Sequence, residues 1–223
     1  MPSPKRAKSK PAPRRNAPDL APELPEVHNV AETFGIVEIV VRDQIMENLA
    51  LQQTTASSVV LEGCILNRVD LSESKIGSLR LKDTRLTDCD LANTECLRLV
   101  VVRSEFVGCR MTGFQAVGSD CRDLLVSEGD QRYSRWTQGR FVASEFVACN
   151  FQDADWQECD LRGAIFGRCN LRNADLTSSV LQDTDLRGSQ IEGLKVGAKD
   201  LYGAIVDPAQ AMQFAALLGL KIR

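Results

Sequence analysis

Apolar residues recur at every fifth position of this chain, in one register that runs from Leu61 to Val206. The register opens with Leu61, Leu66, Leu71, Ile76, Leu81 and Leu86, and it closes with Leu181, Leu186, Ile191, Val196, Leu201 and Val206. A period of five fits neither an α-helix, whose period is about 3.6, nor a flat strand, whose period is 2. It fits a short unit that turns a corner and stacks on the next coil, so the pattern predicts a solenoid.

The positions before each apolar residue repeat as well. Two positions before it the residue is mostly small, and one position before it the residue is often Asp or Asn. The clearest units are Ala154-Asp155-Trp156, Cys159-Asp160-Leu161, Ala174-Asp175-Leu176 and Thr184-Asp185-Leu186.

This pattern resembles the pentapeptide repeat family, whose unit is written A-(D/N)-L-x-x. The resemblance covers residues 57–206, about two thirds of the chain. It implies an all-β solenoid, a right-handed quadrilateral β-helix in which four units make one square coil. It also implies that the apolar residue and the small residue point inward, and that residues 20 apart stack in columns.

The register weakens at 111–135, where large and small residues exchange places. The apolar positions there hold Met111, Ala116, Cys121, Val126 and Gln131, and the small positions hold Phe114, Leu124 and Gly129. Either the coil continues with compensating sizes, or a loop of a multiple of five residues leaves it. The intact register on both sides favours a continuous coil, in which a buried Gln131 needs hydrogen-bond partners.

Both ends of the solenoid depart from the pattern. Residues 1–26 are rich in Pro, Ala, Lys and Arg, and we expect a disordered basic tail because they bury little apolar surface. Residues 27–56 hold a β-rich apolar run and are expected to form an N-terminal β cap, since an open terminal coil is an unpaired sheet edge. The register also extends back through Val41, Met46 and Leu51.

Residues 207–223 are predicted to form a short C-terminal α-helix. Asp207 is a good N-cap and Pro208 suits the first helical position. The helix is expected to end near Leu218, with Gly219 as its stop. Its apolar side chains either cover the last coil only or also form a homodimer contact, as the resemblance to gyrase-binding family members suggests. The candidate dimer residues are Met212, Phe214, Leu217 and Leu218.

Charge is distributed unevenly along the chain. The first 18 residues carry six Lys or Arg and no acidic residue, whereas the rest carries 21 basic and 30 acidic residues. The basic tail either keeps the protein soluble or makes weak contacts with nucleic acid. No apolar leader and no 18-residue apolar run occurs, so we expect a bacterial cytoplasmic protein that makes no membrane contact.

Eight cysteines raise the question of disulfides or metal. All eight fall at predicted inward positions, where a free thiol behaves as a small hydrophobe. We therefore expect buried thiols, no metal and no cofactor. Catalysis is not expected either, because the only histidine, His28, lies beside the basic tail. The repeated Asp residues are assigned to corners, where they bond nearby backbone groups.

Two function classes remain. Some pentapeptide repeat proteins resemble duplex DNA in shape and charge and bind DNA gyrase, which gives fluoroquinolone tolerance. The most acidic predicted side carries Asp70, Glu73, Asp90, Asp130, Asp153 and Glu192, and it also carries Arg110, Arg132 and Arg172. This mixture of signs is more typical of lateral ion pairing than of a DNA mimic.

The other class is a non-enzymatic protein-binding or scaffold module. Outward positions on two adjoining sides carry aliphatic residues, which in a contiguous patch often mark a partner site. This aliphatic set consists of Val100, Val102, Val107, Leu125, Val142, Val147 and Ile165. The sequence favours the binding module, with a partner of unknown identity, and keeps the gyrase-binding DNA mimic as the alternative.

Overall fold

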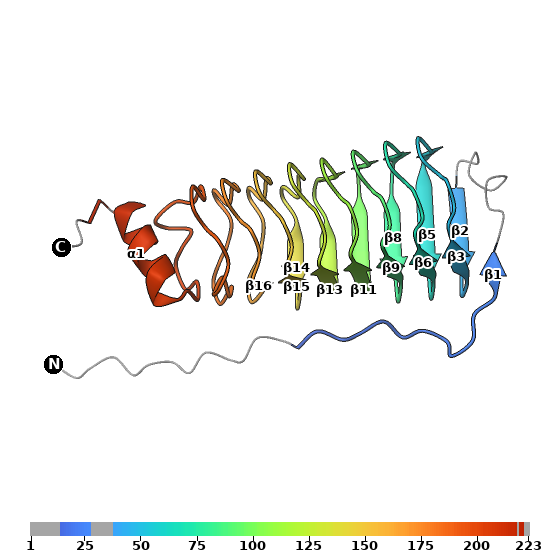
Figure 1. Ribbon diagram of the computed structural model, residues 1–223, viewed down its shortest axis with the longest axis horizontal. Helices are drawn as coiled ribbons and strands as arrows, with labels where there is room; N and C mark the ends of the chain where they lie inside the picture. The colour runs from blue at the N-terminus through green and yellow to red at the C-terminus, as the bar shows by residue number, and fades with distance from the viewer. Residues whose placement is uncertain (1–13, 28–37, 218, 221–223) are drawn as a thin grey trace.

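The chain folds into a rod of stacked coils closed by one helix (Figure 1). The computed structural model describes residues 14–27, 38–217 and 219–220. Its strands are β1 (Glu26–Val27), β2 (Glu38–Arg42), β3 (Ile45–Glu47), β4 (Thr55–Ala56), β5 (Ser58–Glu62), β6 (Ile65–Asn67), β7 (Lys75–Ile76), β8 (Leu79–Lys82), β9 (Arg85–Thr87), β10 (Glu95–Cys96), β11 (Leu99–Val107), β12 (Gln115–Ala116), β13 (Asp120–Ser127), β14 (Arg140–Val142), β15 (Glu145–Val147) and β16 (Ile165–Gly167). The helix is α1 (Pro208–Leu217).

Each coil contains twenty residues, because each strand residue pairs in parallel with the residue twenty positions later, in the next coil. Val59 of β5 lies opposite Leu79 of β8, which lies opposite Leu99 of β11. Side 1 of the coil holds the column of Leu61 and Leu81, and side 2 holds that of Leu66 and Leu86; together these sides form the 12-stranded sheet. The fold class predicted from the register, an all-β solenoid of four-sided coils with a C-terminal helix, is confirmed.

The other two sides are more weakly paired. Side 3 is joined by isolated bridges such as that between Asp70 and Asp90, and side 4 begins as the four-stranded sheet of β4, β7, β10 and β12. Most corners between sides share one backbone conformation, and the corners at Ser58, Ser78 and Arg98 are exceptions. The residue two positions after an apolar one turns the chain with a positive φ, as in Asp83 (φ 50) and Asp123 (φ 55). The sequence reasoning did not anticipate this left-handed corner, which costs a non-glycine residue about 1 kcal/mol.

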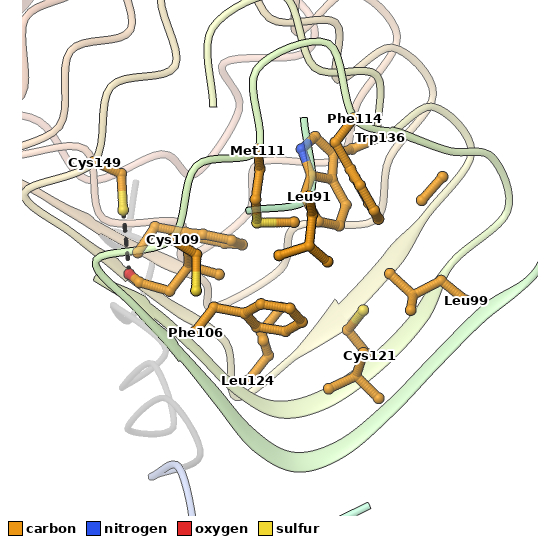
Figure 2. Close-up of a cluster of buried hydrophobic side chains, with 14 of the residues drawn as sticks. Leu91, Leu99, Phe106, Cys109, Met111, Phe114, Cys121, Leu124, Trp136 and Cys149 are labelled. Carbon is orange, nitrogen blue, oxygen red and sulfur yellow. Dashed lines mark hydrogen bonds between the residues drawn. The ribbon is translucent and has the colours of Figure 1, made fainter. Parts of the chain in front are cut away.

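Inward polar groups are satisfied by carbonyls of the preceding coil. The Thr184 hydroxyl donates to the Leu161 carbonyl at 2.7 Å, and the Ser189 hydroxyl donates to the Phe166 carbonyl at 2.7 Å. The Cys149 thiol makes the same contact with the Val126 carbonyl at 3.2 Å (Figure 2). The small position therefore fills space and also satisfies a corner carbonyl, which explains why Ser, Thr and Cys share it.

All eight cysteines are buried free thiols, as the register predicts. Burial raises the pKa of the Cys96 thiol to about 11 and that of Cys159 to about 12. A thiol with such a pKa carries almost no thiolate at neutral pH, and its reactivity is correspondingly low.

The coil continues without a loop through 111–135, as the intact register predicts. β13 pairs in register with β11 before it and with β14 and β15 after it. The large Phe114 is accommodated against Trp136, with ring centroids 5.1 Å apart, and Figure 2 shows both among the buried side chains of this region. Gln131 is fully buried, and neither of its amide atoms has a hydrogen-bond partner among the described residues.

The segment expected to form an N-terminal β cap includes three strands, β2, β3 and β4. β2, β3 and β4 pair in register with the coil that follows, so residues 38–56 form a regular first coil. They do so because Val41, Met46 and Leu51 already hold the inward positions. Only β1 lies outside this coil, paired with β3. The rest of the predicted cap, including Phe34, Ile36 and Val37, lies outside the described residues.

Residues 14–26 of the predicted basic tail contact the coils, and the expectation of disorder stays a prediction. These residues run along the rod, parallel to its long axis, from β1 toward the middle coils (Figure 1). Side-chain contacts with distant coils hold them there, which the apolar content of the segment does not reveal. Lys5, Arg6, Lys8 and Lys10 lie outside the described residues, as does His28.

The C-terminal helix begins as predicted. Asp207 and Gln210 form a reciprocal cap, in which each side-chain oxygen accepts the other's backbone N–H, at 2.9 and 3.0 Å. The Gln210 Nε2 also donates to the carbonyls of Leu186 (2.6 Å) and Ser189 (2.8 Å). The cap of the helix is thus bonded directly to the last complete coil.

Candidate interaction surfaces

The aliphatic set lies on the 12-stranded sheet, as the sequence predicts. All seven side chains face outward on sides 1 and 2, and each is half-buried. Strand register interrupts the set, however. Arg122 lies between Val102 and Val142, and Glu145 lies between Leu125 and Ile165. Ser127 likewise separates Val107 from Val147. The surface is therefore a mixed apolar and charged sheet rather than a continuous aliphatic patch.

Two exposed aliphatic residues that the sequence patterns did not single out lie on another side of the β-helix. Leu97 is 78% exposed and Val117 is 42% exposed. Both follow inward residues of side 4, Cys96 and Ala116, so they stack in one outward column on that side. The five-residue register could have identified this column, because Leu97 and Val117 occupy the same outward position in successive coils.

The acidic side predicted from the sequence is partly compensated, because three of its six acids are paired with neighbouring guanidinium groups. Arg132 donates to Asp130 at 2.7 Å and Arg172 lies 3.1 Å from Glu192, while Arg110 bonds Asp90. Hydrogen bonds from Arg132 outweigh the effect of burial and lower the pKa of Asp130. Asp130 is therefore ionised at neutral pH, and its charge is locally compensated by Arg132.

The predicted dimer residues do not form one exposed face. Phe214 is only 7% exposed and belongs to the core cluster, so it covers the last coil. Met212 is 55% exposed. Leu218 and the side chain of Leu217 lie outside what the structure describes. A hollow of about 440 Å³ lies between α1 and the last coil, lined mainly by apolar residues that include Ile191, Leu194 and Phe214.

A third surface, absent from the sequence predictions, lies at the corner between sides 1 and 2. Three acidic side chains there, Asp83, Glu105 and Asp123, contact the segment formed by residues 15–19. Because these contacts join residues 64 to 107 positions apart, no local pattern in the sequence marks them. We call these three residues the corner groove.

Within the described residues, no group of three or more His, Cys, Asp or Glu is arranged to hold a metal ion. The same part of the chain contains no helix with the length and apolar character needed to cross a bilayer.

Comparison with known proteins finds a family similarity in the C-terminal half of the solenoid. Residues 144–166 and 157–193 match the family model described as pentapeptide repeats, in eight copies. No curated protein matches the chain significantly. The matched units have the same four-sided coil as the coils before them, with Asn150 bridged to both Asp130 and Asn170. Residues 144–193 of the chain are therefore similar to pentapeptide repeats.

Among solved structures, the chain is similar to full-length QnrB1, a plasmid-mediated fluoroquinolone resistance protein, at 20% identity and a TM-score of 0.34 over 81% of this chain and 90% of that one. It is similar to Rfr23 of the cyanobacterium Cyanothece 51142 at 17% identity and a TM-score of 0.30, over 56% and 88% of the two chains. It is also similar to HetL of Nostoc sp. strain PCC 7120, involved in heterocyst differentiation regulation, at 14% identity and a TM-score of 0.25, over 79% and 90%.

Proposed function

We propose that this protein is a non-enzymatic binding or scaffold module of the cytoplasm, and that a protein partner docks on sides 1 and 2 of its β-helix. The observation that carries the proposal is the aliphatic set, whose seven members all face outward on the 12-stranded sheet. Outward aliphatic residues that share one face favour protein contact. Arg122 and Glu145, which alternate with them, supply charges that would fix the orientation of a partner.

The shape of the molecule supports a binding role. Its inward positions are filled by apolar side chains and by hydroxyls and thiols already bonded to carbonyls. Some of its outward charges pair between successive coils along the rod, such as Arg110 with Asp90 and Arg172 with Glu192. Such a rod offers long flat surfaces, which suit a partner that contacts several coils at once.

The test is a double substitution on the sheet. Val102→Lys with Val147→Lys places two charges within the aliphatic set and should abolish capture of the partner from a lysate. Val117→Lys is the matched control, because the same change on side 4 leaves sides 1 and 2 untouched. Proteins captured by the wild type and the control, but lost with the double variant, support the proposal. Identical captured proteins for all three chains would refute it.

The gyrase-binding DNA mimic is tested separately. A duplex mimic needs a long uncompensated negative face, whereas Asp90, Asp130 and Glu192 are each paired with an arginine. We therefore expect the purified protein to leave gyrase supercoiling unchanged at high micromolar concentration. Inhibition, or protection from a fluoroquinolone, would establish the DNA mimic instead.

A homodimer through α1 remains a separate proposal. Met212 is its exposed apolar residue, whereas Phe214 is engaged with the last coil. Light scattering at micromolar concentration would give 24.6 kDa for a monomer and would exclude the dimer. If a dimer is found, Met212→Lys should dissociate it.

A further inference from the structure

We propose that the corner groove is a binding site for an extended, arginine-containing peptide segment of a partner protein, and that residues 15–19 of this chain occupy it in cis. The site is formed by Asp83, Glu105 and Asp123, none of which belongs to the aliphatic set. The inference goes beyond the proposed docking on sides 1 and 2, because it names a second surface and the chemistry that surface recognises.

Glu105 is the main recognition group of the groove. Its side chain is 8% exposed and lies 3.0 Å from Arg15 and 2.9 Å from Arg85. The Arg15 side chain is itself only 15% exposed. A carboxylate buried to this extent needs cationic partners, and Arg85 occupies one oxygen while Arg15 occupies the other. The groove therefore selects a segment that carries an arginine.

The two aspartates recognise the extended backbone of the segment. Asp123 Oδ1 accepts the Asn16 backbone N–H at 2.8 Å and the Asn16 amide at 3.1 Å. Asp83 Oδ1 accepts the Asp19 N–H at 3.0 Å while Arg103 is bonded to both its oxygens, at 2.7 and 2.5 Å. Arg103 and the Asp19 N–H together outweigh burial and lower the pKa of Asp83, which keeps it an acceptor.

The spacing of the groove fits an extended chain. Asp83 and Asp123 are two coils apart, which is about 9.6 Å at a strand spacing of about 4.8 Å. Three extended residues span about 10 Å, and Asn16 and Asp19 are three positions apart. The distance between the two aspartate acceptors therefore matches the distance between the two backbone N–H groups that they accept. Two of the four contacts use backbone N–H groups of the segment and a third is the arginine ion pair, so another extended segment with an arginine at the first position would reproduce these three.

The cis segment is held in a way that permits exchange. Residues 14–25 form no strand. Strand pairing begins after them, at β1, which pairs with β3. Arg14, Asn16, Ala17 and Asp19 are exposed. Side-chain contacts without a backbone ladder are weaker than strand addition, and a partner segment at sufficient concentration can displace them.

The test uses a fluorescein-labelled peptide that reproduces residues 12–22, titrated in trans and followed by fluorescence anisotropy. The full chain carrying Arg15→Glu and Asn16→Ala releases its own segment, and hydrogen exchange over residues 14–24 confirms the release. We expect saturable binding to this variant and at least tenfold weaker binding to the wild type, whose groove is occupied. A peptide with alanine at the position of Arg15 should bind at least tenfold more weakly than the parent.

Substitutions in the groove locate the site. In the released variant, Glu105→Gln should weaken binding of the peptide at least tenfold. If Glu105→Gln disturbs the fold, Asp123→Asn tests the same site at a half-exposed position and should also weaken binding. Asp88→Asn, a corner aspartate of the next corner with the same left-handed backbone, is the matched control and should have no effect. The proposal is overturned if the released, folded variant does not bind the peptide, or if Glu105→Gln, Asp123→Asn and the control bind it equally. Neither result bears on Val102 and Val147, so failure here leaves the docking proposal intact.

Discussion

Gln131 is the residue whose replacement should stabilise the protein most directly. It is fully buried, and its two amide atoms have no hydrogen-bond partner among the described residues. A buried polar group without a partner costs about 1–3 kcal/mol. Its Nε2 occupies space that a side chain at Gly129 would need, since a Cβ there would lie 2.3 Å from Nε2. The amide therefore fills a volume that the neighbouring glycine leaves open.

Methionine is the replacement of choice because it matches glutamine in chain length and adapts its shape to irregular gaps. Gln131→Met should raise the free energy of unfolding by about 1–3 kcal/mol, since it keeps the volume and removes the unsatisfied groups. In thermal unfolding that corresponds to a rise of about 2–10 °C for a chain of this size. Gln131→Leu should gain less, because a shorter side chain leaves part of the gap beside Gly129 empty.

The assay is urea unfolding followed by circular dichroism, with the m-value compared between variants so that a change in cooperativity is not mistaken for stability. The exposed Gln115 supplies the matched control, and Gln115→Met should change stability by less than about 0.5 kcal/mol. A Gln131→Met variant with native circular dichroism that is as stable as the wild type, or less stable, would refute the reasoning, because the amide would then be satisfied.

Three further predictions concern other parts of the molecule. In a thiol titration at neutral pH, none of the cysteines of the native protein should react, because all are buried and the pKa values of Cys96 and Cys159 are raised. After unfolding without reductant, eight thiols should react, and a count below eight would reveal disulfides. The hydrogen bonds that Arg162 and Arg187 donate lower the pKa values of Asp160 and Asp185. The two ion pairs therefore contribute fully to the free energy of unfolding above the unfolded Asp pKa of about 3.9, and this contribution is lost as the pH falls through the lowered pKa values of the folded protein. Thermal melts should therefore be level between pH 6 and 8 and fall below about pH 4, and a midpoint unchanged at pH 3 would contradict this. Gln210→Ala removes the bonds to Leu186 and Ser189 and should cost about 1–3 kcal/mol, with faster hydrogen exchange confined to α1 and the last coil; uniform acceleration along the rod would argue against a local cap.

The sequence was sufficient for the solenoid because every coil repeats the same local requirement. Leu66, Leu86 and Phe106 must all be apolar for the same reason, so the signal accumulates over the chain. The repeat pattern is weaker in the first coil because β2 to β4 lack the Asp and Asn residues of the later repeats, although Val41 and Met46 keep the inward register.

The surfaces were harder to predict than the core. The register correctly placed Val102 and Val147 on one sheet, since orientation alternates along a strand. It did not identify the corner groove, because the ion pair of Arg15 with Glu105 joins distant residues through flexible side chains. The positive φ at corners such as Asp83 was also missed, since Asp, Asn, Arg, Glu, Ala and Ser all occupy that position.

The twenty-residue register has a consequence for how such a rod can change during evolution. An insertion of five residues would preserve every inward position, yet all coils beyond it would present their surfaces a quarter turn away from the original direction. An insertion of twenty residues would lengthen the rod and leave each surface facing as before. Either insertion therefore leaves the packing of the core unchanged. An insertion of five residues between Val102 and Ile165, however, would move Ile165 a quarter turn relative to Val102 and disrupt the binding of a partner that contacts both. Length changes in multiples of a whole coil should accordingly be tolerated between binding positions, and changes of a single unit should separate them.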